Sequence, residues 1–190
     1  MLGRMVPLQM RLKKTVVLVG MMGAGKTAVG TVLAKRLAVP FLDSDAAIEK
    51  AANMSIAEIF ARDGEGFFRA KESQVISRLL DDERGILSTG GGAFLSEANR
   101  EMISERGVSV LLDADEDLLW NRVRHKDSRP LLRTANPRRT LQDLIAKRGP
   151  IYAQADLKVR ALPHYAVTDT AEKVIEALLT RPDVLELEEA

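Results

Sequence analysis

The sequence contains no cysteine and few aromatic residues. The lack of cysteine excludes disulfides and thiolate metal sites and suits a reducing compartment, so we expect a cytoplasmic protein. Aromatic side chains make up only 4% of the chain, so the core must be built from aliphatic residues. No apolar run approaches the ~20 residues of a membrane-spanning helix, so we expect no membrane partner.

Neither sign of charge is in excess. The 28 basic and 27 acidic residues give a net charge of +1, so no global field favours nucleic acid as a partner. The length of 190 residues suits one domain, and 46% hydrophobic residues are enough for its core. We expect this domain at residues 15–181, after an N-terminal extension (1–14) and before an acidic C-terminal tail (182–190).

Short apolar runs alternate along the chain with stretches of helical periodicity. We expect strands at Thr15–Val19, Val39–Leu42, Gly85–Thr89, Val108–Leu112 and Tyr165–Val167. Helices are expected between them, with a break at Asn53 or Ser55 and a last helix at Thr170–Leu179. This alternation predicts an α/β fold of three layers, with a central parallel sheet of about five strands flanked by helices. The ends show no clear period, so we expect them to be loosely held.

The stretch GMMGAGKT at Gly20–Thr27 follows the first expected strand and fits the pattern G-x-x-x-x-G-K-[ST]. Its glycines allow a tight turn whose N–H groups, with the next helix N-terminus, bind phosphate oxygens. Lys26 is placed to reach the β- and γ-phosphates, and the Thr27 hydroxyl to bind Mg²⁺. Met21 and Met22 are interpreted as fillers. The alternative, a plain turn with a solvated lysine, is disfavoured because chance gives this pattern less than about 1% of the time.

Polar residues and glycines follow two other expected strands at their carboxyl ends, where ligands bind in open parallel sheets. Asp43 and Asp45 follow the second strand and, at positions i and i+2 of an extended segment, would share one face. Helix capping is the alternative. Gly90–Gly92 follow the third strand and allow close backbone approach to a ligand, whereas a plain turn is the alternative.

Arginines suggest that the ligands are anionic. Arg69 lies in a stretch of helical periodicity and is suited to clamp a carboxylate, although a salt bridge with Glu65 or Glu72 is the alternative. Residues 122–139 are basic, which suits a lid over nucleotide phosphates at about 122–138, and Arg129 is restricted by the proline after it. Solvated charge is the alternative for most of this segment. Nucleic-acid binding is disfavoured because interleaved aromatic residues are missing.

Together these stretches resemble the shikimate kinase family, from about residue 15 to about residue 170. The motifs that carry the resemblance are, in order, GMMGAGKT, DSD at 43–45, GEGFFR at 64–69, GGG at 90–92, RPLL at 129–132 and RGPIY at 148–152. The resemblance implies a P-loop kinase fold and ATP-dependent phosphorylation of the shikimate 3-hydroxyl, giving shikimate 3-phosphate and ADP in aromatic amino acid biosynthesis. It implies Mg²⁺ as cofactor, and we expect a monomer that binds shikimate and ATP and no nucleic acid.

Motif by motif, the resemblance also implies residue roles. The residues implied to bind ATP are Gly23, Ala24, Gly25, Lys26, Thr27, Ala28, Arg122 and Arg129, of which Arg122 aligns less securely. Those implied to bind the acceptor are Asp45, Arg69, Gly90, Gly91, Gly92 and Arg148. Mg²⁺ would be held by Thr27 and, through water, by Asp43. Catalysis would rest on Lys26, Asp45 and Arg129, with Asp45 taking the acceptor proton or only positioning the hydroxyl.

Three other functions fit part of the sequence. One is another small-molecule kinase, such as a gluconate kinase, against which GEGFFR and RGPIY favour shikimate. A non-catalytic nucleotide-binding module would lack a catalytic group, yet every group assigned a role is present. A nucleic-acid protein would use residues 122–139. The departures from the family pattern, Ala28 where threonine is frequent and Ile151 where leucine is common, remove none of these groups.

Overall fold

Five parallel strands form the central sheet of the computed structural model, which describes residues 8–126 and 130–189. In sequence order the strands are β2 (Thr15–Val19), β3 (Phe41–Asp43), β4 (Ile86–Ser88), β5 (Gly107–Asp113) and β6 (Leu157–Arg160). Their order across the sheet is β3-β4-β2-β5-β6, and every neighbouring pair is parallel. The central strands β2 and β5 are almost continuous apolar runs because both faces of the sheet are covered.

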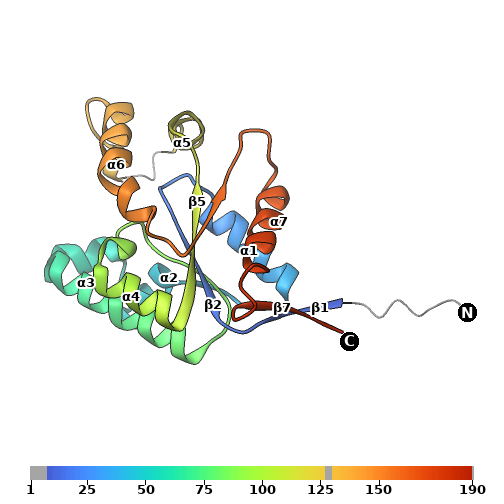
Figure 1. Cartoon of the computed structure of the whole chain (residues 1–190). Coiled ribbons are helices and arrows are strands. Elements are labelled where there is room, and N and C mark those ends of the chain that lie inside the picture. Colours follow the sequence, from blue (N-terminus) through green and yellow to red (C-terminus); the bar gives the residue numbers. More distant parts are fainter. Residues whose placement is uncertain (1–7, 127–129, 190) are drawn as a thin grey trace, which may run out of the picture.

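Helices cover the two faces of this sheet (Figure 1). On one face, α1 (Lys26–Leu37) packs beside α7 (Val167–Leu178), and on the other α3 (Ile56–Asp82) packs beside α4 (Glu97–Arg106). The remaining helices are α2 (Ser44–Ala52), α5 (Glu116–Val123) and α6 (Pro137–Tyr152), with short 3₁₀ turns η1 (Ala93–Leu95) and η2 (Pro130–Leu132). The prediction of a three-layer α/β fold with a five-stranded parallel sheet is therefore confirmed.

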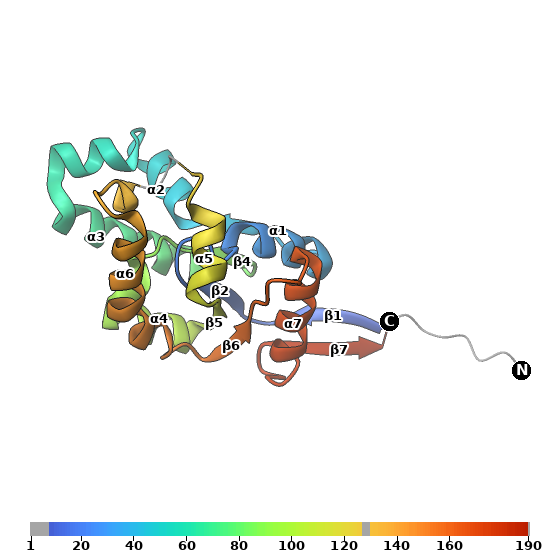
Figure 2. The ribbon, with the colours of Figure 1, turned by 90° about the horizontal axis from the view of Figure 1, so that it is seen from above.

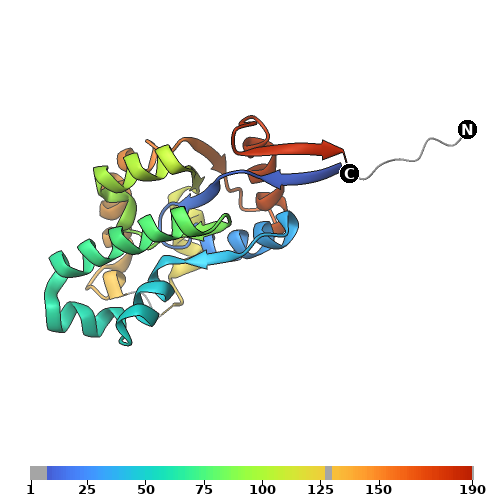
Figure 3. The same ribbon diagram turned by 90° about the horizontal axis from the view of Figure 1, so that it is seen from below.

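The chain between β3 and β4 forms part of the wall of the candidate site. The predicted break is confirmed, since α2 ends at Asn53 in a left-handed conformation (φ 51°) and α3 begins after Ser55. Ser55 and Glu58 form a reciprocal capping box that fixes this start. Helix α3 then bends sharply at Gly64, whose φ of 83° favours glycine (Figure 3). The bend turns the second half of α3, with Arg69, back along the sheet.

The expected strand at Tyr165–Val167 is wrong. The fifth strand is β6, and Val167 already begins α7. Of the four residues in β6 only Val159 is buried, because this strand lies at the edge of the sheet. Its charged, half-exposed sequence therefore carried no apolar signal, whereas the more apolar Tyr165–Val167 did.

The ends of the described chain are not loosely held as expected. Strand β1 (Leu8–Leu12) pairs antiparallel with β7 (Leu185–Glu189), and the pair extends from the body beside α7 (Figure 2). At its base the cross-strand partners Leu12 and Leu185 are both buried in the main core. Each strand does alternate apolar and polar residues, a strand period that sequence reasoning missed. Their pairing, between opposite ends of the chain, is revealed only by the fold.

The core between the sheet and the helices is aliphatic, as the composition predicts. Among the described residues, the buried aromatic side chains are Phe68, Phe94 and Tyr152. Within the same residues, no helix combines the length and apolar character that crossing a membrane would need.

The β1–β7 pair allows a matched test of this core. Leu185 is 1% exposed and Leu187, on the same face of β7, is 51% exposed. We expect Leu185→Ala to lower the free energy of unfolding by about 2–5 kcal/mol. The exposed control Leu187→Ala should stay within about 0.5 kcal/mol of the parent. Urea denaturation measures both, and equal losses would contradict the observed packing.

Candidate active site

The loop between β2 and α1 has the conformation that its glycines predict. Gly20, Gly23 and Gly25 have φ values of 145°, 82° and 98°, a region that favours glycine. Gly25 is the N-cap of α1 and no side chain caps the helix, so backbone N–H groups at this end are left to bind an anion. Lys26 Nζ donates to the carbonyl oxygens of Gly20, at 2.7 Å, and Met21, at 3.1 Å. The ammonium group is thus held over the loop.

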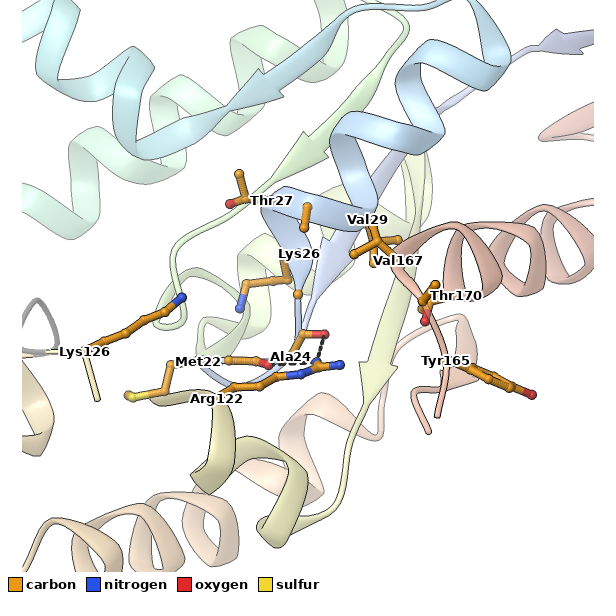
Figure 4. Close-up of a pocket in the computed structure, with 14 residues that line it drawn as sticks. Met22, Ala24, Lys26, Thr27, Val29, Arg122, Lys126, Tyr165, Val167 and Thr170 are labelled. Atoms are coloured by element: carbon orange, nitrogen blue, oxygen red, sulfur yellow. Dashed lines mark hydrogen bonds between the residues drawn. The ribbon is translucent and has the colours of Figure 1, made fainter. Parts of the chain in front are cut away.

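A cavity of about 540 Å³ opens beside this loop (Figure 4). The predicted nucleotide-binding residues that line it are Gly23, Ala24, Gly25, Lys26, Thr27, Ala28 and Arg122. Arg122 reaches the loop from α5, where its Nη1 donates to the carbonyl oxygens of Gly23, at 3.0 Å, and Ala24, at 3.2 Å. Its guanidinium therefore lies beside the loop, and its role in binding ATP stays a prediction.

Sequence reasoning missed the opposite wall of this cavity. Tyr165, Val167 and Thr170 line it from the segment that enters α7 and from the helix itself (Figure 4). A Tyr–Ala–Val run has no phosphate-binding or acid–base chemistry to mark it as a site. The signal that could have identified it is positional, because this segment follows β6 at the carboxyl end of the sheet.

A second cavity, of about 820 Å³, adjoins the first and shares Met22, Lys26 and Thr27 with it. It brings together nearly all the remaining predicted site residues, namely Asp43, Asp45, Arg69, Gly90, Gly91, Gly92 and Arg148. Arg129 lies outside the described residues, whereas the adjacent Pro130 and Leu131 line this cavity. Two ligand spaces therefore meet at the lysine and threonine of the loop.

Asp43 and Asp45 both line the second cavity, but not for the reason expected from the sequence. Strand β3 ends at Asp43 and Asp45 lies in the first turn of α2, so the two are not alternate residues of one strand. Asp43 Oδ1 accepts a hydrogen bond from the Ala46 N–H at 3.0 Å, which is a helix N-cap. Asp43 therefore caps α2 and lines the cavity, so the two interpretations coexist.

The carboxyl group of Asp45 is electrostatically unusual. Its pKa is raised from 3.8 to about 6, mainly by burial and also by the neighbouring carboxylates of Asp43, Glu72 and Glu49, while Arg69 opposes the rise. A carboxyl with a pKa near 6 is largely ionised at neutral pH and is more basic than an ordinary aspartate. It is therefore suited to accept a hydrogen bond, or a proton, from a hydroxyl group.

Arg69 is held in place by Glu72, a residue to which the sequence gave no role in the site. Arg69 Nη1 donates to Glu72 Oε1 at 2.7 Å, and Arg69 Nε lies 3.7 Å from Glu65 Oε1. Glu72 is 1% exposed and its Oε2 has no hydrogen-bond partner among the described residues. Both predicted salt bridges thus exist, yet Arg69 still lines the cavity. An acidic residue three positions after a ligand-binding arginine was the available signal.

The glycines at 90–92 make room for side chains. A β-carbon on each would meet one polar group of the cavity: Gly90 would meet Asp45 Oδ1 at 2.9 Å, Gly91 would meet Arg148 Nη1 at 3.2 Å, and Gly92 would meet Arg69 Cζ at 2.6 Å. Contacts below about 3 Å are not sustained by real β-carbons. The approach of this backbone to a ligand stays a prediction, but the glycines meet another requirement, since each admits one polar side chain of the cavity.

The donor set at the junction of the two cavities fits a hard cation. Thr27 and Asp43 offer a hydroxyl and a carboxylate oxygen to the same space. Among the described residues, no group of three or more His, Cys, Asp or Glu side chains is arranged to hold a metal ion by itself. One or two protein oxygens suit Mg²⁺, which keeps several waters and takes further ligands from substrate phosphates.

Comparison with known proteins agrees with this geometry. The family model described as shikimate kinase matches residues 22–179. The shikimate kinase of Cereibacter sphaeroides is 66% identical over 179 residues, which are 94% of this chain and 89% of that protein. The shikimate kinase of Ruegeria pomeroyi is 66% identical over 176 residues, 93% of this chain and 90% of that protein.

A solved structure shares the fold. The shikimate kinase from Acinetobacter baumannii, in complex with shikimate, superposes with a TM-score of 0.80 and is 38% identical. The match covers 88% of this chain and 93% of that one.

The raised pKa of Asp45 predicts a pH-dependent stability. A carboxyl whose pKa is raised by folding contributes stability that is fully present below its unfolded pKa, 3.8, and lost as the pH rises to about 6. We therefore expect Asp45→Asn to stabilise the protein at about pH 8 by about 1–2 kcal/mol, discounted for partial solvation. This gain should shrink at about pH 4.5.

Thermal and urea unfolding at the two pH values measure this difference. Asp82→Asn is the matched control because Asp82 is exposed and outside both cavities, so it should change little at either pH. An effect of Asp45→Asn that is equal at both pH values would contradict the assignment.

Proposed function

This chain belongs to the shikimate kinase family and is a small-molecule kinase, and we propose that it transfers the γ-phosphoryl group of ATP to the 3-hydroxyl of shikimate. The observation that carries this proposal is the meeting of two cavities at Lys26 and Thr27. One cavity is built around a phosphate loop, and the other combines two arginines with the carboxylate of Asp45, whose pKa is raised. A donor and an acceptor bound in them would adjoin at the loop lysine.

The first cavity supplies the groups that a nucleotide triphosphate needs. The N–H groups of residues 23–28 and the Lys26 ammonium neutralise phosphate charge. Charge neutralisation and positioning account for most of the catalysis of phosphoryl transfer. Arg122 braces the loop through its bonds to Gly23 and Ala24 and offers its guanidinium to the nucleotide. Arg129 is proposed to reach the phosphates as part of a lid, as the family resemblance implies.

The second cavity supplies complementary groups for a hydroxylated carboxylate. Arg69 and Arg148 are both cationic and would bind the carboxylate of shikimate by paired hydrogen bonds. Asp45 would accept hydrogen bonds from the ring hydroxyls, which an ionised carboxylate can do but an arginine cannot. Gly90–Gly92 keep these three side chains close together.

The reaction moves one proton and one phosphoryl group. The acceptor oxygen bonds to the γ-phosphorus, the bond from that phosphorus to the β–γ bridging oxygen breaks, and the acceptor hydroxyl loses its proton. With a pKa of about 6, Asp45 is the group best placed in the cavity to orient this hydroxyl and receive that proton. Lys26, between the cavities, stabilises the charge on the transferring group.

We propose Mg²⁺ as the cofactor, held by Thr27 and, through water, by Asp43. When bound, it would neutralise phosphate charge and help to orient the leaving group. The working unit is proposed to be a monomer, because residues of one chain line both cavities. Location in the cytoplasm is proposed from the absence of cysteine.

A coupled ADP-release assay with shikimate and with gluconate tests the proposal. We expect turnover of shikimate in preference to gluconate, and no shikimate-dependent ADP would overturn the proposal. Lys26→Met should lower kcat by at least about 100-fold, because it removes charge stabilisation from the transferring group. The control Lys35→Met makes the same change at an exposed position of α1 and should keep parental activity. If the protein were instead a non-catalytic nucleotide-binding module, the parent would show no turnover, and Lys26→Met could not lower it.

The glycine series makes a separate prediction about acceptor affinity. Gly92 has a φ of −88°, so alanine fits the backbone, but its β-carbon would displace the Arg69 guanidinium. We expect Gly92→Ala to raise the KM for shikimate by about 10-fold or more, which is a loss of about 1.4 kcal/mol, and the KM for ATP by less than about 2-fold. Gly149→Ala is the control, since its β-carbon would meet nothing within 4 Å. Equal effects of the two variants would contradict the role given to Gly92.

A further inference from the structure

Tyr152 carries a buried hydroxyl group beside the second cavity, where it contacts the glycine turn. It is the last residue of α6, it is 2% exposed, and its ring stacks with Phe94 at a centroid separation of 6.5 Å. Its hydroxyl donates to the carbonyl oxygen of Gly91 at 2.5 Å. This hydrogen bond joins the end of α6 to the middle of the glycine turn.

Arg148 lies one helical turn before Tyr152, on the same face of α6. A β-carbon on Gly91 would lie 3.2 Å from Arg148 Nη1 and 3.5 Å from the Tyr152 hydroxyl, so both side chains converge on this glycine. Burial raises the pKa of Tyr152, and a hydrogen bond with Arg148 and its charge oppose that rise. The guanidinium and the phenol therefore lie beside each other at this glycine.

The direction of these hydrogen bonds follows from the groups themselves. A phenol has one proton and two lone pairs, and the Tyr152 proton is used by the Gly91 carbonyl. An arginine can only donate, so a hydrogen bond between the two groups would use a lone pair of the phenol oxygen. The Gly91 carbonyl thus fixes the phenol, which keeps a lone pair open to the Arg148 guanidinium beside it.

The two acceptor-site arginines are oriented by different partners. Arg69 is held by the buried carboxylate of Glu72 at 2.7 Å. No carboxylate lies within ion-pair distance of Arg148 in the part of the chain that the structure describes, and the neutral phenol of Tyr152 lies beside it at Gly91. A neutral partner leaves the full positive charge of Arg148 available to an anion.

We propose that Tyr152 is a positioning residue for the acceptor, whose hydroxyl holds Arg148 against the glycine turn in the orientation that binds the acceptor carboxylate. The inference rests on the proposed function, in which Arg148 binds that carboxylate. It predicts a contribution to acceptor affinity that acts through Arg148 and leaves the phosphate loop unaffected.

Tyr152→Phe tests the role because it removes only the hydroxyl. We expect the KM for shikimate to rise about 5- to 10-fold, since the Arg148 guanidinium loses a neutral polar neighbour that orients it but keeps its own charge. The kcat should stay within about 3-fold, and the KM for ATP within about 2-fold. A fall in kcat with an unchanged KM for shikimate would overturn the proposal.

Thr15→Val is a matched control for the loss of a buried hydroxyl. Thr15 is also 2% exposed, and its Oγ1 donates to a backbone carbonyl, that of Glu83, at 2.6 Å. It lies at the start of β2, at the opposite end of the sheet from the cavities. Both variants should lower the melting temperature, but only Tyr152→Phe should raise the KM for shikimate. A similar rise in both would show that Tyr152 acts only on stability and would overturn the proposal.

A double-mutant cycle tests whether the effect passes through Arg148. In the Arg148→Ala background, Tyr152→Phe should change the KM for shikimate by less than about 2-fold. Full additivity would overturn the proposed route. If Tyr152→Phe does not fold, Gly91→Ala replaces it, because its β-carbon would press on both groups. An unchanged KM for shikimate in that variant would equally overturn the proposal.

These measurements distinguish a failure of the proposed function from a failure of the role given to Tyr152. If the parent enzyme does not turn over shikimate, the proposed function and the role of Tyr152 both fail. If the parent turns over shikimate and Tyr152→Phe has the parental KM, the proposed function stands and only the role of Tyr152 fails.

Discussion

The acceptor half of the site depends on one steric constraint, which is the absence of β-carbons at Gly90–Gly92. Three polar side chains approach this turn from separate helices, with Asp45 on α2, Arg69 on α3 and Arg148 on α6. Each comes so close to one glycine that a methyl group there would press on it. The turn is therefore the surface that side chains of three distant segments approach, and the cavity lies where they converge.

The electrostatics of the site follow from that convergence. Crowding Asp45 and Glu72 together with Arg69 raises the pKa of both carboxyls through burial, and it leaves the Oε2 atom of Glu72 without a partner in the described chain. These groups reduce the stability of the fold, because a desolvated charge is unfavourable unless it is fully paired. In the proposed complex, the hydroxyls of shikimate would donate to these carboxylates and its carboxylate would pair with Arg69, which would lower this electrostatic cost.

The sequence predicts the parts of this molecule whose signals are local. The phosphate loop, the alternation of strands and helices, Asp45 and Arg69 are recognisable from residue type and spacing, whereas Arg148 was implied only by the family resemblance. What it could not predict depends on contacts between distant segments: the edge strand β6 with its single buried valine, the pairing of β1 with β7, and the use of glycines to admit side chains. Tyr152 was missed for the same reason, since its hydrogen bond joins α6 to the distant glycine turn. Glu72 differs, because it lies three residues from Arg69 in the same helix and was named only as a possible salt-bridge partner.

The variable positions of the phosphate loop show how far contacts refine a motif. Met21 and Met22 were interpreted as fillers, yet they differ in the fold. Met21 is 7% exposed and belongs to the main core, so it anchors the loop to the sheet. Met22 lines both cavities, together with Lys26 and Thr27. An unbranched, polarisable side chain there can adapt to two ligands at once. Met22 is thus part of the wall that the two cavities share. The phosphate-loop motif describes only the phosphate-binding side of this wall.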